Sequence, residues 1–253
     1  MTILSRRRLI GSIGAGAGGL LLSGCDRIVA APTVKHVLGI GEKLSFDAQR
    51  LVTDRAALAR EFAASDMSPV FRTNGNTMPE SEAYQAHATA GFADWRLAVD
   101  GLVRRPSTTS LAQIHTMPAR TQITRHDCVE GWSAIGKWTG VPLKLLLDAA
   151  GVLPGARYVV FHCADDFGGD PYYESIDLID AYHPQTILAW GMNDQLLSIG
   201  HGAPLRLRVE RQLGHKQAKY VMRVELVDSL ARVGAGGGGY WEDSSGYQWY
   251  AGI

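Results

Sequence analysis

The chain is poor in cysteine and carries no excess charge of either sign. Its 253 residues include three cysteines, and 25 basic residues balance 25 acidic ones. Zinc sites are marked by closely spaced ligands such as CxxC or HExxH, and neither spacing occurs in this sequence. A chain with balanced charge also lacks the basic stripe that nucleic-acid binding requires. We therefore expect neither a zinc site nor a nucleic-acid partner.

Long apolar runs are scarce as well. One stretch, from Leu9 to Gly24, is apolar in character, but glycine dilutes it, and a bilayer core needs about 20 apolar residues. The run Ser5–Ile10 offers a serine, two arginines, a variable position that Arg8 fills and two apolar residues, and it fits the twin-arginine export pattern. We therefore interpret residues 1–24 as an export signal and expect the protein in the periplasm.

Cys25 ends a short run, Leu22-Ser23-Gly24-Cys25, that fits the lipobox of bacterial lipoproteins. In such proteins the cysteine is lipidated and becomes the mature N-terminus. The following Asp26 is associated with retention at the inner membrane. The alternative is that Cys25 lies near an ordinary cleavage site. We expect a lipid anchor at Cys25 that holds the protein at the inner membrane.

The remaining chain predicts short helices mixed with short strands. We expect residues 25–66 to form a tether followed by a helix that Thr53 caps and that runs to about Ala64. Residues 67–253 then form one domain. Pro142 is placed to open a helix that Gly151 closes. Alternating apolar residues predict strands near 95–101, 158–163, 186–190, 205–209 and 220–227.

These elements lack the regular βαβ spacing of a parallel α/β sheet. The pattern therefore predicts an α+β domain with mixed β-sheets and short helices. A glycine-rich segment, Gly234 to Gly239, has no lysine–serine/threonine pair after it and is not a phosphate loop. We expect this segment to be a flexible connection.

The most informative segment is Arg125-His126-Asp127-Cys128-Val129-Glu130-Gly131-Trp132-Ser133. Cys128 stands there among charged, glycine and aromatic residues, whereas an inert structural cysteine normally lies in apolar surroundings. A thiolate is a soft, strongly donating metal ligand, and basic neighbours stabilise its charge. The alternative is a partly buried thiol that packs as a small hydrophobic residue.

This run resembles the cysteine loop of the sulfite oxidase superfamily. The layout is most similar to that of its single-domain periplasmic branch, the protein-methionine-sulfoxide reductases. The resemblance implies a sulfite-oxidase-type molybdopterin-binding fold and a molybdenum–molybdopterin cofactor. It also implies that Cys128 is the one protein ligand to molybdenum and the catalytic residue.

Two further segments match cofactor-binding runs of the same superfamily. His201-Gly202-Ala203-Pro204-Leu205-Arg206 resembles a run that contacts the pterin and its terminal phosphate, and a guanidinium fork suits a phosphate. Gly214-His215-Lys216 resembles a turn that holds the phosphate and the pterin edge, while Lys219 matches a less specific basic position. The alternatives are a solvated strand face for Arg206 and Arg208, and a plain turn with solvated lysines.

Asn74 and Cys163 complete the candidate cofactor site. Phe71-Arg72-Thr73-Asn74-Gly75 falls where the superfamily has an asparagine that contacts the pterin, although Asn76 competes for that role and Asn-Gly is also a turn signal. Cys163 falls where the methionine-sulfoxide reductases carry a threonine near the metal. It either lines the active site or fills space inside a sheet.

The resemblance implies an oxidoreductase that catalyses two-electron oxygen-atom transfer. S-oxide reduction and sulfite-type oxidation are both open, with a small-molecule or protein-bound sulfur-oxo substrate. The expected partner is a membrane haem or quinone-linked electron carrier, and the expected oligomeric state is a monomer. The competing hypothesis is a non-catalytic exported lipoprotein that retains the scaffold as a binding module.

Overall fold

The computed structural model of this protein describes residues 32–253. The chain divides into two compact units, residues 1–53 and residues 54–253. The predictions for Arg6, Arg7 and Cys25 concern positions outside the described residues. From Pro32 onward, no helix combines the length and the apolar character that a bilayer crossing demands.

In the first unit, a helix stands where we predicted a tether. Helix α2 spans Pro32–Val52 and begins at a proline, whose fixed φ suits the first helical turn. Apolar residues recur along it at helical spacing, for example at Val37, Leu44 and Leu51. The prediction of a tether is therefore wrong over residues 32–50, because polar content does not exclude a helix whose apolar residues keep helical spacing.

The predicted helix from Thr53 to Ala64 is also wrong. A turn occupies residues 54–57, and the chain after it is extended, where Glu61 forms an isolated bridge with Thr124. The backbone N–H of Phe62 donates to the carbonyl of Ile123 at 2.9 Å, and the N–H of Ala59 donates to Oε1 of Gln185 at 2.7 Å. Long-range hydrogen bonds thus override the local helical spacing.

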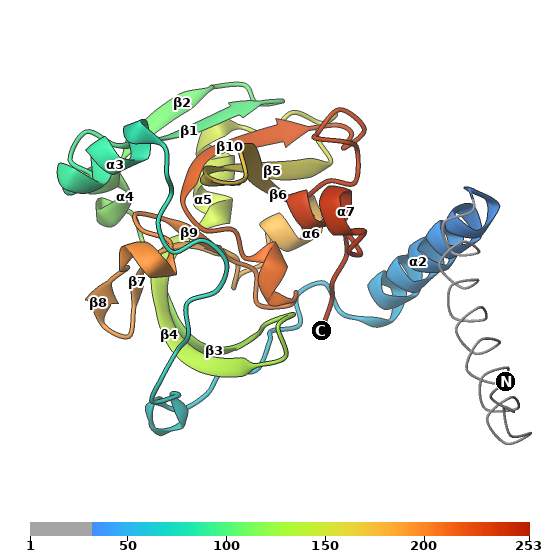
Figure 1. Cartoon of the computed structure of the whole chain (residues 1–253), viewed down its shortest axis with the longest axis horizontal. Helices are drawn as coiled ribbons and strands as arrows, with labels where there is room; N and C mark the ends of the chain where they lie inside the picture. Colours follow the sequence, from blue (N-terminus) through green and yellow to red (C-terminus); the bar gives the residue numbers. More distant parts are fainter. Residues whose placement is uncertain (1–31) are drawn as a thin grey trace, which may run out of the picture. The chain divides into compact units, whose positions relative to one another are not determined.

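The second unit is built on two five-stranded sheets, which Figure 1 shows as an upper and a lower layer. The first sheet has the order β2-β1-β10-β5-β6, and β1 pairs with β10 in parallel while its other pairs are antiparallel. Its strands are β1 Arg96–Gly101, β2 Ser107–Ser110, β5 Tyr158–Phe167, β6 Asp170–Asp177 and β10 Val221–Val227. The sheet is therefore mixed, as predicted.

The second sheet is antiparallel and has the order β3-β4-β7-β8, with β9 paired to β7. Its strands are β3 Arg120–Asp127, β4 Ser133–Pro142, β7 Ile187–Met192, β8 Gln195–Leu196 and β9 Arg206–Arg208. The long β3–β4 hairpin pairs Arg120 with Gly140 at one end and Asp127 with Ser133 at the other. Cys128 follows directly, so the hairpin tip carries the candidate thiol.

Short helices connect the strands. They are η1 Ala64–Asp66, α3 Glu82–Thr89, α4 Leu111–Thr116, α5 Leu143–Ala150, α6 Leu178–Ala181, η2 Ile199–His201, η3 Gly214–Lys216 and α7 Tyr240–Ser245. Helix α5 confirms the sequence prediction, because Pro142 precedes it and Gly151 ends it in a left-handed conformation with φ 71°. Together with the mixed sheet, these helices confirm the α+β class.

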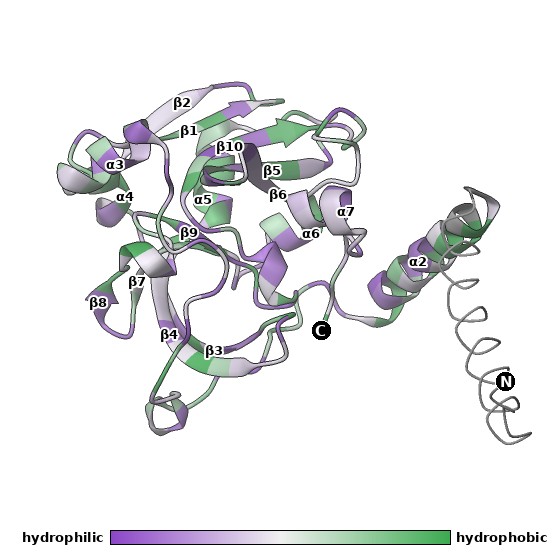
Figure 2. Ribbon diagram, in the orientation of Figure 1, coloured by the Kyte–Doolittle hydropathy of each residue, from purple (hydrophilic) through white to green (hydrophobic). Residues whose placement is uncertain are grey.

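The main hydrophobic core combines residues of both sheets and of α5, among them Leu97, Leu146, Val159, Leu188 and Val224. Figure 2 shows green, hydrophobic segments in β5, α5 and β10, which contribute to this core. Three leucines of α5, Leu143, Leu146 and Leu147, are buried in this core. This apolar packing fixes the sheets on which the polar site is built.

The glycine-rich segment is anchored, so the prediction of a flexible connection is wrong. The carboxylate of Asp243 accepts hydrogen bonds from the backbone N–H groups of Ala235 at 2.9 Å and Gly237 at 2.7 Å. A side chain at Gly239 would collide with the carboxylates of Glu242 and Glu174. The glycines therefore serve close packing against α7 rather than flexibility.

Candidate active site

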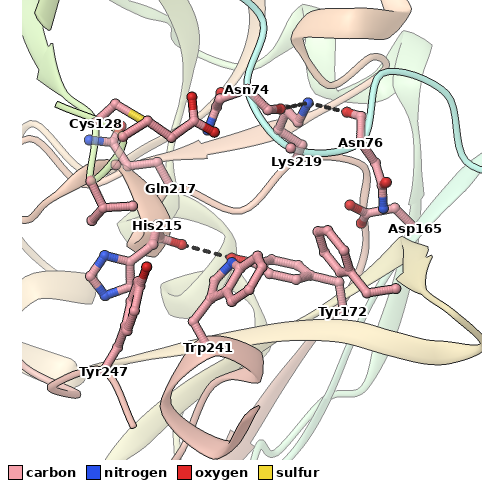
Figure 3. Close-up of a pocket in the computed structure, with 15 residues that line it drawn as sticks. Asn74, Asn76, Cys128, Asp165, Tyr172, His215, Gln217, Lys219, Trp241 and Tyr247 are labelled. Carbon is pink, nitrogen blue, oxygen red and sulfur yellow. Dashed lines mark hydrogen bonds between the residues drawn. The ribbon is translucent and has the colours of Figure 1, made fainter. Parts of the chain in front are cut away.

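A cavity of about 210 Å³ opens beside the tip of the β3–β4 hairpin. Figure 3 shows its lining residues, which come from segments far apart in the sequence: 74–76, 128–130, 165–172, 214–219 and 241–247. Of the predicted site residues, the cavity brings together Asn74, Cys128, Gly214 and His215. Lys219, which matches a less specific basic position, and Asn76, the alternative to Asn74, line it as well.

Cys128 lies in a tight turn at the hairpin tip. Its backbone N–H donates to the carbonyl of Trp132 at 2.9 Å, and Gly131 closes the turn with φ 84°, a conformation that favours glycine. Cys128 is 8 % exposed and lines the cavity. Burial raises the pKa of its thiol, whereas the backbone N–H of Glu130 and the charge of Arg206 lower it. A metal cation in the cavity would draw off the proton and bind the thiolate.

Lys219 anchors the loop that carries Asn74 and Asn76 through hydrogen bonds. Its Nζ donates to the carbonyls of Asn74 at 2.6 Å and Gly200 at 3.0 Å, and also to the carbonyl of Asn76. Burial, followed by the charge of Arg206, lowers the pKa of Lys219 to about 7. An anion in the cavity would raise the pKa of Lys219 again and so favour its charged, ammonium form.

Asp165 is a lining residue that sequence reasoning missed. It is 4 % exposed, and its Oδ1 has no hydrogen-bond partner among residues 32–253. Burial raises the pKa of Asp165 to about 6, against the lowering effect of Lys219. A buried acceptor without a partner normally awaits a donor. The sequence signal that could have indicated Asp165 is its position as an acidic residue in β5, a strand that is largely buried.

Aromatic residues form another side of the cavity. The rings of Trp241 and Tyr247 are stacked at 6.0 Å, and His215 meets Tyr247 edge-on at 5.1 Å. The hydroxyl of Tyr172 donates to the carbonyl of His215 at 2.7 Å. Burial, with the charge of Lys216, lowers the pKa of His215 to about 4, so its imidazole is neutral at pH 7. Apart from His215, the sequence did not predict these residues because they lie on separate elements.

Arg206 lies in a buried layer behind the cavity. It is 1 % exposed, and its guanidinium donates to the carbonyls of His201 at 3.1 Å and Gln217 at 3.3 Å. Arg208 is equally buried and is paired with Glu210 at 2.6 Å. The alternative of a solvated strand face is therefore wrong for both arginines. Arg206 supports the backbone of Gln217, which lines the cavity.

The other three predicted residues also lie off the cavity lining. His201 places Nδ1 2.8 Å from Oγ of Ser198 and Nε2 3.2 Å from the carbonyl of Phe71. Cys163 lines a neighbouring pocket, which shares Asp165 with the cavity, and burial raises the pKa of its thiol. Lys216 is fully buried in an ion cluster. Their predicted contacts with a cofactor stay predictions.

The lining residues fit the chemistry of a molybdopterin cofactor. Cys128 offers a soft sulfur ligand, and Lys219 offers a cation for a phosphate. Oδ1 of Asp165 and Oε1 of Gln217 are buried acceptors without partners in the described part of the chain. A pterin carries N–H donors that such acceptors can bind, and its flat ring suits aromatic neighbours.

Comparison with known proteins also indicates a molybdopterin-binding domain. The family model described as oxidoreductase molybdopterin binding domain matches residues 84–232. A relative from Azospira oryzae, named putative protein-methionine-sulfoxide reductase subunit YedZ1, is 44 % identical over 160 residues, which cover 63 % of this chain. The match covers 56 % of that relative's own length.

Among solved structures, the sulfane dehydrogenase SoxCD of Paracoccus pantotrophus matches 54 % of this chain and 39 % of its own. The match has a TM-score of 0.49 and a sequence identity of 25 %. The family match spans more than half of the 253 residues and includes Cys128 and the segments around 206 and 219. The chain therefore belongs to the oxidoreductase molybdopterin-binding domain family and is an oxidoreductase by descent.

Proposed function

We propose that this protein is a periplasmic molybdenum-cofactor oxidoreductase that transfers an oxygen atom in a two-electron reaction. The observation that carries the proposal is the position of the Cys128 thiol at the cavity wall. Figure 3 shows Cys128 and Asp165 at opposite ends of the labelled group, with Asn74 and Lys219 between them. A metal ligand at one end, with Gln217 beside it, and the Asp165 carboxylate at the other end match an elongated cofactor.

Four lining residues have proposed roles toward that cofactor. Cys128 would hold the molybdenum, Lys219 would neutralise the phosphate, and Asp165 with Gln217 would accept hydrogen bonds from the pterin. When bound, the cofactor supplies oxygen-atom transfer and two-electron redox chemistry. The chain contributes a thiol whose deprotonated form is opposed by burial and by the Glu130 carboxylate, and favoured by the backbone N–H of Glu130 and the charge of Arg206. It also contributes aromatic walls that keep water from the site.

S-oxide reduction is the direction that the relative's name supports. Reduction of a sulfoxide to a sulfide consumes two electrons and two protons and releases one water. The relative is named a subunit, which supports a partner that delivers the electrons, and we propose a membrane haem or quinone-linked carrier. A methionine sulfoxide, free or protein-bound, is the proposed substrate.

The proposed location rests on the sequence before Pro32. Arg6 and Arg7 fit a twin-arginine signal, and Cys25 fits a lipid attachment site. Export of a folded protein suits an enzyme that receives its cofactor in the cytoplasm. Replacing both arginines with lysine should leave precursor in the cytoplasm. Unchanged periplasmic levels of that double variant would contradict the proposed export route.

Elemental and pterin analysis of the purified protein tests the proposed function. We expect close to one molybdenum and one pterin per chain, together with methionine sulfoxide reduction by an artificial electron donor. A well-folded protein from molybdenum-replete cells that holds neither molybdenum nor pterin would refute the enzyme and favour the exported binding module.

A further inference from the structure

Lys216 is buried in a cluster that the proposed chemistry does not use. Its Nζ lies 2.8 Å from Oε1 of Glu242 and also bonds Oε1 of Glu174. The side chains of Lys216 and Glu174 are fully buried, and that of Glu242 is nearly so. Lys216 therefore has no free access to the cavity, although its neighbours His215 and Gln217 line it.

Both carboxylates belong to elements that also supply the cavity lining. Glu174 lies on β6 two residues after Tyr172, and both side chains face the interior. Glu242 lies on α7 directly after Trp241, and Tyr247 follows the helix. Lys216 thus joins three elements, η3, β6 and α7, at a point behind the aromatic side of the cavity.

The charges of the cluster are unbalanced. One ammonium faces two carboxylates, and Oε2 of Glu174 and Oε2 of Glu242 have no hydrogen-bond partner among residues 32–253. Burial raises the pKa of Glu174, with the charge of Glu242 adding to the effect and Lys216 opposing it. Such a cluster costs desolvation free energy, and removing its one cation would leave two adjacent buried carboxyl groups with no cation to offset their charge.

We propose that Lys216 is a positioning residue that acts through Glu242 and Glu174 to hold Trp241 and Tyr247 against the cofactor cavity. This inference rests on the proposed function, because it takes the cavity as the cofactor site. It assigns Lys216 a role different from the direct phosphate contact that the sequence resemblance implies. In this arrangement Lys219 is the lysine that meets the cofactor.

A positioning role for Lys216 and a direct phosphate contact predict opposite effects for one substitution. Glu242→Ala removes the link to α7 and leaves Lys216 in a balanced pair with Glu174, so the fold should survive. If Lys216 positions the wall, Glu242→Ala frees Trp241 and Tyr247 and the cofactor is lost faster. If Lys216 binds the phosphate directly, losing a competing carboxylate leaves retention unchanged or improves it.

The experiment compares full-length wild type, Glu242→Ala, Glu242→Gln and Lys144→Met. Bound pterin is measured by its fluorescence after release, the rate of pterin loss is followed on dilution, and folding is checked by near-ultraviolet circular dichroism. Lys144, which pairs with the exposed Asp148 on α5, is a control for the loss of an ion pair. Glu242→Gln keeps the length of the side chain and an acceptor oxygen.

We expect Glu242→Ala to lose pterin roughly tenfold faster than wild type. Glu242→Gln should restore most of the retention, and Lys144→Met should match wild type. Equal or slower pterin loss in Glu242→Ala would overturn the positioning role.

If Glu242→Ala does not fold, Glu242→Asp replaces it, because its carboxylate reaches less far. We expect the same faster pterin loss in Glu242→Asp, and wild-type retention in that variant would overturn the role. A wild type without pterin would refute the proposed function and this inference together.

Discussion

Lys216 and Lys219 stand three residues apart and end in opposite surroundings. The Lys216 ammonium meets two carboxylates in the interior, whereas the Lys219 ammonium meets three backbone carbonyls at the cavity. The backbone between them separates the two side chains, because the turn of η3 ends at Lys216 and Gln217 adopts φ −98° and ψ 69°. A motif can therefore locate a cofactor-binding segment without telling which of its lysines reaches the ligand.

The largest effect that separates the two lysines is on stability. Lys216→Met should lower the free energy of unfolding by about 3–5 kcal/mol, because it leaves two buried carboxylates without their cation. Lys219→Met should cost about 1–2 kcal/mol, because water in the open cavity can hydrate the carbonyls that it leaves. Urea unfolding of the two cofactor-free variants gives the comparison. Equal losses would contradict the distinction between a structural and a cavity-facing lysine.

The second effect concerns the cofactor. Lys219→Met should weaken cofactor retention on the order of 2 kcal/mol, roughly thirtyfold, because the phosphate loses a charge-assisted contact. Pterin content after extended dialysis is the measurement, with Lys144→Met as the matched control on an exposed helix. Full pterin retention in Lys219→Met would move the phosphate contact to another residue.

The third and smallest effect is the pH dependence that Lys219 confers. Its ordinary pKa is 10.5, and the folded, cofactor-free chain lowers it to about 7. Between these values the unfolded chain binds the extra proton, so this group should make the free energy of unfolding rise with pH over that window. Cofactor retention should change in the opposite direction and fall as pH rises through 7, because the anion needs the charged form.

The difference between wild type and Lys219→Met isolates this contribution. Asp165 titrates nearby with a pKa raised to about 6, and it should make stability fall as pH rises from 3.8 to 6 in both proteins. A wild-type minus Lys219→Met difference in unfolding free energy that stays flat between pH 7 and 10 would show that Lys219 keeps its ordinary pKa.

Local pattern predicts five of the ten strands of the domain. Strands β1, β5, β7, β9 and β10 lie where alternating residues predicted them, and α5 begins and ends at its proline and glycine. The errors lie where long-range contacts decide the structure. Residues 59–62 pair with β3 and Gln185, and Gly239 packs against two carboxylates, neither of which local spacing reveals.

The candidate site likewise contains residues that could be predicted from the sequence and residues that could not. Cys128 could be predicted because its ligand chemistry is visible in a short run of residues. Asp165, Tyr172 and Trp241 could not, because they reach the cavity only through the arrangement of β5, β6 and α7. Arg206 lies in a buried layer over Trp138, at 5.0 Å from the ring centre, and its predicted contact with the cofactor stays a prediction.

The central claim is that Cys128 binds molybdenum, and X-ray absorption at the molybdenum edge tests it most directly. Serine has nearly the volume of cysteine but offers a harder, weakly acidic oxygen. In Cys128→Ser the metal should therefore show one sulfur neighbour fewer than in wild type, while the protein still folds and still binds pterin. An unchanged sulfur count around molybdenum in Cys128→Ser would contradict the assignment.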